Sequence, residues 1–216
     1  MTGVLVDLGL VEYGRAWALQ KELVARRAAD SIPDTLLLLE HPHVITLGRK
    51  TSPENFRPQN VPVFQIERGG DATYHGPGQL VGYPIVKLED HDVRRHVRTM
   101  EDAIVATASR FGVESERKEG RPGIWVGDQK LASIGVAVTD WVSFHGFALN
   151  VNTDLSYFEL IRPCGLDPSS MTSIRRITGR EVPITEVKQE FARQYATFKG
   201  EEFVRQDPAR PLLGKR

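Results

Sequence analysis

The sequence has little cysteine: Cys164 is the only one among 216 residues. A single cysteine cannot form a disulfide within the chain or supply a multi-cysteine zinc site, so neither is expected to stabilise the fold. The thiol is therefore either a small buried hydrophobe or a reactive nucleophile. A lone cysteine is more often buried and inert. Pro163 and Gly165 nevertheless predict a turn at this position, where a thiol is more accessible.

An excess of one charge and long apolar runs are also missing. The 28 Lys and Arg residues balance the 28 Asp and Glu residues, so the chain has no overall positive field to attract nucleic acid. No window approaches about 18 uninterrupted apolar residues, the length of a membrane-spanning helix. Asp7 interrupts the N-terminal segment where a signal peptide needs a hydrophobic stretch. We therefore predict no nucleic-acid partner, no membrane association and a cytoplasmic location.

The rest of the composition is that of an ordinary globular protein, with 40% hydrophobic, 26% charged and 8% aromatic residues. The length favours one domain, because domains typically have about 100–200 residues. The chain shows no internal repeat and no long linker. Pro208 and Pro211 follow Gly200, so we predict a single domain over residues 1–200 and a frayed C-terminal tail over 201–216.

Hydrophobic periodicity predicts long helices separated by groups of short strands. Apolar residues spaced three or four apart predict helices at residues 11–30, 92–111 and 185–198, with a short helix near 155–160. Short apolar runs predict strands at residues 35–39, 44–47, 61–67, 80–88, 124–126, 131–138 and 144–151. Pro84 indicates that its strand lies at a sheet edge or bends. This order favours an α+β fold with a mixed, largely antiparallel sheet and packed helices over a doubly wound nucleotide-binding fold.

A glycine-rich loop over residues 68–79 is the first segment that could carry chemistry. Its four glycines would let the backbone approach a ligand closely. The loop lacks the Gly-Lys-Ser/Thr ending of a Walker phosphate loop and the helix that directly follows a dinucleotide fingerprint. A glycine-rich loop by itself is often only structural. Arg68, Thr73, Tyr74 and His75 lie beside these glycines, and so many polar groups indicate a ligand-binding loop.

Lys130 is the second candidate. Strict alternation along a strand places its side chain on the same face as Ala132, Ile134 and Val136. A lysine that is partly removed from water has a pKa below its usual value of about 10.4 and can act as a base. Alternatively, Lys130 ends the preceding turn and extends along the surface with its ammonium in water. The residues alone leave both possibilities open.

Histidines could supply a base for a Cys/His nucleophilic pair. His75 and His145 lie in polar loop or strand contexts and are the better candidates. His41 and His43 flank a proline, and no carboxylate or cysteine cluster lies close to them in sequence. We therefore predict no metal site.

These segments together contain the motifs of one enzyme family. Its most specific pattern, RGGxxTxHxxGQxxxY with an aromatic residue before the histidine, is met at every fixed position by Arg68, Gly69, Gly70, Thr73, Tyr74, His75, Gly78, Gln79 and Tyr83. A lysine motif matches residues 130–135, a histidine-glycine motif matches 145–150, and a PCG motif matches 163–165. Over about residues 9–174 the chain resembles the lipoyl(octanoyl) transferases, the octanoyl-[acyl carrier protein]:protein N-octanoyltransferases of lipoate biosynthesis.

The resemblance implies a site and a fold. Cys164 would be the nucleophile that accepts the acyl group, and Lys130 would be its activating partner. The implied substrate pocket is lined by Arg68, Gly69, Gly70, Asp71, Ala72, Thr73, Tyr74, His75, Ser133, Ile134, Gly135, Gly146, Phe147 and Ala148. The implied fold is the one shared by lipoate-protein ligases and biotin-protein ligases.

The resemblance also implies an activity, the first step of endogenous protein lipoylation. An octanoyl group would pass from octanoyl-acyl carrier protein through a Cys164 thioester to a lysine of lipoyl domains. These acceptors belong to the 2-oxoacid dehydrogenase complexes and to the glycine cleavage H protein. Forming an amide from a thioester is downhill, so no ATP, metal or redox cofactor is expected. The alternatives are an ATP-dependent ligase of the same fold, a thioesterase and a non-catalytic acyl-binding module.

Overall fold

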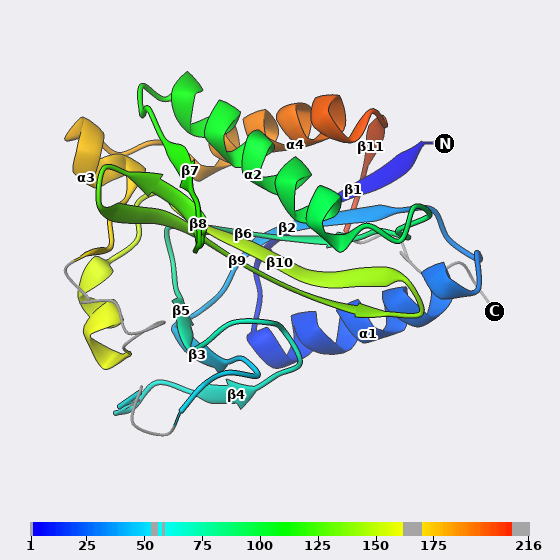
Figure 1. Ribbon diagram of the computed structural model, residues 1–216, viewed down its shortest axis with the longest axis horizontal. Helices are drawn as coiled ribbons and strands as arrows, with labels where there is room; N and C mark the ends of the chain where they lie inside the picture. Colours follow the sequence, from blue (N-terminus) through cyan, green and yellow to red (C-terminus); the bar gives the residue numbers. More distant parts are fainter. Residues whose placement is uncertain (1, 53–55, 58, 162–169, 209–216) are drawn as a thin grey trace.

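The computed structural model describes residues 2–52, 56–57, 59–161 and 170–208. Its centre is an eight-stranded sheet in the order β11-β1-β2-β6-β10-β9-β8-β7 (Figure 1). In chain order these strands are β1 (Gly3–Leu10), β2 (Thr35–Glu40), β6 (Gln79–Ile85), β7 (Glu116–Lys118), β8 (Arg121–Val126), β9 (Gln129–Thr139), β10 (Val142–Asn150) and β11 (Phe203–Gln206). The pairs β11–β1 and β1–β2 are parallel, and every other pair is antiparallel. The predicted mixed, largely antiparallel sheet is confirmed.

A second, three-stranded sheet lies below the main sheet in Figure 1. It consists of β4 (Val63–Gln65), β3 (Val44–Leu47) and β5 (Thr73–His75), with β3 in the middle. A short turn joins β2 to β3 as predicted, but the two strands belong to different sheets. The chain thus leaves the main sheet at residue 40, builds the small sheet, and returns to the main sheet through β6.

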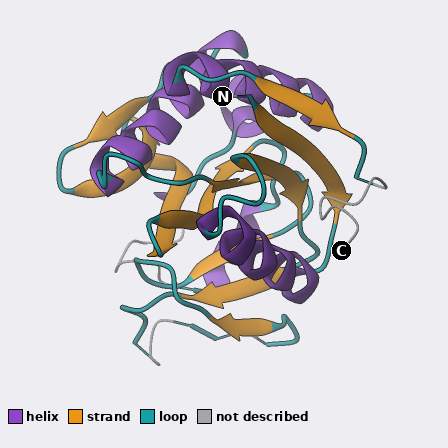
Figure 2. Cartoon of the chain, turned by 90° about the vertical axis from the view of Figure 1, so that its right-hand side faces the viewer, coloured by secondary structure: helices purple, strands orange, loops and turns teal. Residues whose placement is uncertain are grey.

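Helices cover both faces of the main sheet. Helices α2 (Val93–Arg110) and α4 (Ile184–Lys199) lie on one face and α1 (Tyr13–Ala28) on the other (Figures 1 and 2). The leucine run of β2 shows why both faces need cover: Leu36 and Leu38 join the core beneath α2 and α4, while Leu37 and Leu39 join the core beneath α1. Successive side chains of a strand point to opposite faces, so this strand is buried on both sides.

Two shorter helices lie at the left of the molecule in Figure 1, and the first of them packs against the small sheet. These are a 3-10 helix (Leu155–Leu160) and α3 (Ile174–Thr178). The hydroxyl of Ser173 caps α3 by accepting a hydrogen bond from the backbone N–H of Arg176 at 3.1 Å. Asp92 caps α2 in the same way, accepting from the N–H of Arg95 at 2.9 Å. The two caps explain why α3 begins at Ile174 and α2 at Val93.

Of the two alternatives that Pro84 indicated, a sheet edge or a bend, the edge is wrong, because β6 lies between β2 and β10 in the middle of the main sheet. The register of β6 with β10 ends at Gly82, opposite Phe147. Beyond that point a side chain replaces the ladder bond, since the Ser143 hydroxyl donates to the Pro84 carbonyl at 2.8 Å. Pro84 therefore lies in an interruption of the pairing, which resumes at Val86, whose carbonyl accepts from the Ser143 N–H at 2.8 Å.

Part of the tail that was expected to fray is ordered. Residues 203–206 form β11, which pairs in parallel with Gly3–Val6 of β1. Phe203 packs against Tyr195 of α4, with ring centroids 5.6 Å apart.

No helix in the described ranges is long and apolar enough to cross a membrane.

Candidate active site

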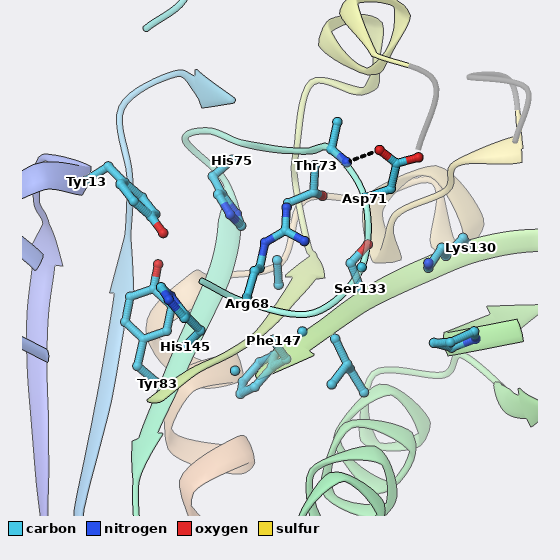
Figure 3. Close-up of a pocket in the computed structure, with 17 residues that line it drawn as sticks. Tyr13, Arg68, Asp71, Thr73, His75, Tyr83, Lys130, Ser133, His145 and Phe147 are labelled. Carbon is cyan, nitrogen blue, oxygen red and sulfur yellow. Dashed lines mark hydrogen bonds between the residues drawn. The ribbon is translucent and has the colours of Figure 1, made fainter. Parts of the chain in front are cut away.

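A pocket lies between the main sheet and the small sheet (Figure 3). Strands β9 and β10 form its floor, and the loop that leads into β5 forms its opposite wall. Its lining consists of Tyr13, Arg68, Gly70, Asp71, Ala72, Thr73, His75, Tyr83, Pro122, Lys130, Ser133, Ile134, Gly135, His145, Gly146, Phe147 and Ala148. The glycine-rich loop, the lysine motif over residues 130–135 and the histidine-glycine motif over residues 145–150 thus meet in one place.

The register of β9 with β10 brings two of these segments side by side. Ser133 lies opposite Ala148, Ile134 opposite Phe147, and residue 135 opposite residue 146. Gly135 is needed for the opposite wall to come close, because a Cβ there would lie 3.0 Å from the Gly69 carbonyl oxygen. The result is a largely apolar floor with small residues at its centre.

Arg68 fastens the glycine-rich loop to the small sheet. Its side chain is buried and donates to the backbone carbonyl of Thr46 at 2.8 Å and to the Thr46 hydroxyl at 3.0 Å. It also donates to the Gly69 carbonyl at 3.0 Å. Bidentate donation to β3 makes Arg68 a rigid part of the pocket wall.

A chain of amides sets the tautomer of His75. The Gln79 amide nitrogen donates to the Tyr74 carbonyl at 3.2 Å and to the Asn150 side-chain oxygen at 2.9 Å. The Gln79 oxygen must therefore accept from Nδ1–H of His75, at 2.9 Å. Burial holds the pKa of His75 well below its usual value, and the neighbouring His41 lowers it further. Neutral His75 thus keeps its Nε2 as a hydrogen-bond acceptor.

His145 lies in the middle of β10 with a backbone φ of +57°. Its N–H donates to the Gln20 side-chain oxygen of α1 at 2.8 Å, and its Nε2 lies 3.3 Å from a Glu67 carboxylate oxygen. Burial lowers the pKa of His145 to about 4, although Glu67 opposes the shift. A left-handed conformation in a strand is costly for a residue other than glycine. These contacts hold the ring at the pocket in spite of that cost.

Lys130 lies in the pocket and not on the surface, since only 7% of it is exposed. The surface alternative for this lysine is therefore wrong. In Figure 3 its side chain lies at the opposite end of the pocket from Tyr13, Tyr83 and His145. Its amine is 5.5 Å from the ring centroid of Trp125.

The structure brings most of the implied pocket residues together. Of that set, only Gly69 and Tyr74 are not part of the lining. The Gly69 N–H donates to the Val136 carbonyl at 3.0 Å, which ties the loop to β9. The Tyr74 ring packs on Phe158, and its hydroxyl bonds to His43 Nδ1 at 2.8 Å. Cys164 lies outside the described residues.

Tyr13 and Pro122 line the pocket although the sequence analysis did not single them out. Tyr13 lies in the first turn of α1, and the apolar face of that helix was the available signal. Burial raises the pKa of its hydroxyl well above the usual value. Tyr13 is therefore a neutral hydroxyl at the end of the pocket away from Lys130.

Replacing Thr46 by valine is expected to loosen Arg68. Valine has the same shape but leaves the buried guanidinium without its hydroxyl acceptor, which costs about 1–3 kcal/mol of unfolding free energy. Urea unfolding would measure the loss, with Thr197→Val on the exposed side of α4 as the matched control. Equal stability of the two variants would show that the Thr46 hydroxyl does not hold Arg68.

Comparison with known proteins identifies the family. The lipoyl protein ligase A/B catalytic domain model matches residues 12–196. An octanoyltransferase of Syntrophotalea carbinolica is 50% identical over 184 residues, which cover 84% of this chain and 87% of that protein. Another, from Syntrophobacter fumaroxidans, is 47% identical, covering 87% and 86%. The chain belongs to the octanoyltransferase family. It is therefore an acyltransferase, as the resemblance implied.

Solved structures support the fold of this octanoyltransferase family member. A bi-partite lipoate protein ligase from Thermoplasma acidophilum superimposes with a TM-score of 0.74 at 19% identity, covering 96% of this chain and 87% of that chain. A biotin protein ligase from Aquifex aeolicus gives a TM-score of 0.53 at 12% identity, covering 93% and 70%. At such identities the likeness concerns the fold alone. The implied ligase-type fold is confirmed.

Proposed function

We propose that this chain transfers an octanoyl group from octanoyl-acyl carrier protein to a lysine of lipoyl domains through a thioester on Cys164. The acceptors are the lipoyl domains of 2-oxoacid dehydrogenase complexes and the glycine cleavage H protein. One observation carries the proposal: a buried lysine amine lies at one end of a largely apolar pocket in a chain whose relatives are octanoyltransferases. We place this reaction in the cytoplasm.

The pocket suits an unbranched acyl chain. From Lys130 to Gly135, the β9 floor spans five residues, or about 16 Å at the usual rise of a strand. An extended eight-carbon chain fits within that length. The floor along this stretch includes Ile134, Phe147 and Ala148, so burial of the acyl chain against it would remove apolar surface from water.

The first half of the reaction loads the enzyme. Neutral Lys130 takes the proton of the Cys164 thiol, and the resulting thiolate attacks the carbonyl carbon of the donor thioester. The tetrahedral intermediate collapses with cleavage of the bond to the phosphopantetheine sulfur. That sulfur takes the proton from the Lys130 ammonium, which leaves an octanoyl-Cys164 thioester and restores the neutral amine.

The second half transfers the acyl group. The ε-amine of the acceptor lysine attacks the octanoyl-Cys164 carbonyl, and the C–S bond breaks as the amide forms. The proton lost by the attacking nitrogen passes through Lys130 to Cys164. In both halves the nucleophile attacks the carbonyl carbon of the octanoyl group, and the proton passes through Lys130. The two protein partners must therefore dock in turn at the Lys130 end of the pocket.

Intact-protein mass spectrometry after mixing with octanoyl-acyl carrier protein, in the absence of ATP, tests the proposal. The expected result is one octanoyl adduct on the wild type, none on Cys164→Ala, and loss of the adduct when a lipoyl domain is added. A lipoyl domain whose target lysine is replaced by arginine serves as the matched control. Labelling that requires ATP and free octanoate would instead indicate a ligase, and release to water a thioesterase.

A further inference from the structure

The strand next to Lys130 partly encloses its side chain. Trp125 of β8 is the register partner of Lys130 in β9, and the register shifts between residues 124 and 125. Only 1% of Trp125 is exposed. Its indole N–H donates to the Arg121 carbonyl at 3.0 Å, which sets the orientation of the ring. The face of a fixed aromatic ring thus lies near the Lys130 amine, 5.5 Å from centroid to Nζ.

Gly123, two residues before Trp125, leaves space for the lysine stem. Its φ is +114°, and a Cβ at this position would lie 2.6 Å from Lys130 Cε and 3.3 Å from Nζ. It would also lie 2.4 Å from the Ala132 carbonyl oxygen. Even a methyl group here would have to displace the end of Lys130 or separate β8 from β9.

Several charged or titratable groups surround the two residues. Lys118 of β7 and Arg121 of β8 lie 5.9 and 5.8 Å from the same indole centroid, and Lys118 pairs with Asp128 at 2.8 Å. The groups that share the pocket with Lys130 are Tyr13, Arg68, Asp71, His75, Tyr83 and His145. Asp128 offsets part of the positive charge of Lys118 and Arg121. The Trp125 ring itself is uncharged, so replacing it changes the surroundings of the Lys130 amine without changing the net charge.

We propose that Gly123 and Trp125 are positioning residues for Lys130: Gly123 admits the terminal methylene of the lysine, and the Trp125 ring stabilises the ammonium that forms when Lys130 takes the Cys164 proton. The inference rests on the proposed function. In that step the S–H bond breaks and an N–H bond forms, leaving a thiolate and an ammonium. The negative face of the indole attracts the ammonium and not the neutral amine. The ring therefore favours the thiolate.

Alkylation of Cys164 by iodoacetamide at a series of pH values tests the role of Trp125. Cys164 is the only cysteine of the chain, and only its thiolate reacts. In Trp125→Leu, the midpoint of the increase in alkylation rate with pH is expected to move to higher pH by about 0.5–1 unit. Trp125→Phe keeps an aromatic face and should move this midpoint less. Trp141→Leu, at the exposed tip of the β9–β10 hairpin, should leave it unchanged.

Gly123→Ala tests the space around the stem. A displacement of about 1 Å at a catalytic group can cost about 100-fold in rate, so acyl-enzyme formation should fall by that order. The matched control is Gly120→Ala, because Gly120 also has a positive φ, +71°, but a Cβ there would meet nothing within 4 Å. Both proteins would first be compared by circular dichroism and thermal unfolding.

The outcomes separate the inference from the proposed function. If Cys164 of the Lys130→Ala variant is alkylated and acylated like that of the wild type, Lys130 is not the base of the proposed function. The inference then fails with it. If Lys130→Ala is impaired while folded Trp125→Leu and Gly123→Ala behave like the wild type, only the inference is overturned. If Trp125→Leu does not fold, Trp125→Phe and the Gly123/Gly120 pair decide.

Discussion

Replacing Lys130 by arginine is expected to slow acyl-enzyme formation by about 100- to 10,000-fold, the usual contribution of a general base. Arginine keeps most of the length of the side chain, but it is always charged and does not lose its proton in proteins. The substitution therefore separates proton transfer from simple attraction of a thiolate. Rapid quenching followed by intact-mass measurement gives the rate of acyl-enzyme formation.

Lys118→Arg is the matched control for this substitution. Lys118 lies near the same indole ring but pairs with Asp128 at 2.8 Å and does not line the pocket. Its replacement should leave the rate unchanged. A Lys130→Arg enzyme that is acylated as fast as the wild type would show that Lys130 supplies charge and that another group takes the proton.

The two strands of the pocket floor could be predicted because local patterns carried them. Short apolar runs over residues 131–138 and 144–151 predicted both strands, but their antiparallel pairing, which puts Ser133 opposite Ala148, is known only from the structure. The glycine-rich loop was visible from composition. What periodicity could not show was that this loop closes onto the same strands, because that contact depends on the long-range bonds of Arg68 and Gly69.

Other features required the tertiary structure. Alternation placed Lys130 on an apolar face but could not decide between burial and solvent, since the deciding residues, Gly123 and Trp125, belong to a neighbouring strand. Pro84 indicated an edge or a bend because it lacks an N–H. It lies instead in the middle of the sheet, beyond the last paired residue of the register with β10, where its carbonyl accepts from the Ser143 hydroxyl. In each case the decisive partner is far away in sequence or of a type that has no local pattern.

Acidification from pH 7 to pH 5 is expected to destabilise the fold strongly, because several histidines are buried in neutral form. Burial lowers the pKa of His41 to about 4, and the same cause acts on His96 and His145. An unfolded histidine binds its proton near pH 6.5. Between pH 6.5 and 4 the unfolded state therefore binds more protons, so stability is complete above that window and falls as the pH decreases through it. At pH 5 each of the three costs about 2 kcal/mol.

His96→Leu isolates one of these contributions away from the pocket. His96 lies on α2, and its buried Nε2 has no hydrogen-bond partner among the described residues. Leucine fills similar space and cannot be protonated, so the variant should lose about 2 kcal/mol less than the wild type between pH 7 and pH 5 in urea unfolding. His91→Leu, at an exposed position, should keep the wild-type slope. Parallel slopes for the wild type and His96→Leu would mean that His96 is not held neutral. Among the buried histidines, the acid sensitivity would then come from His41, His75 and His145.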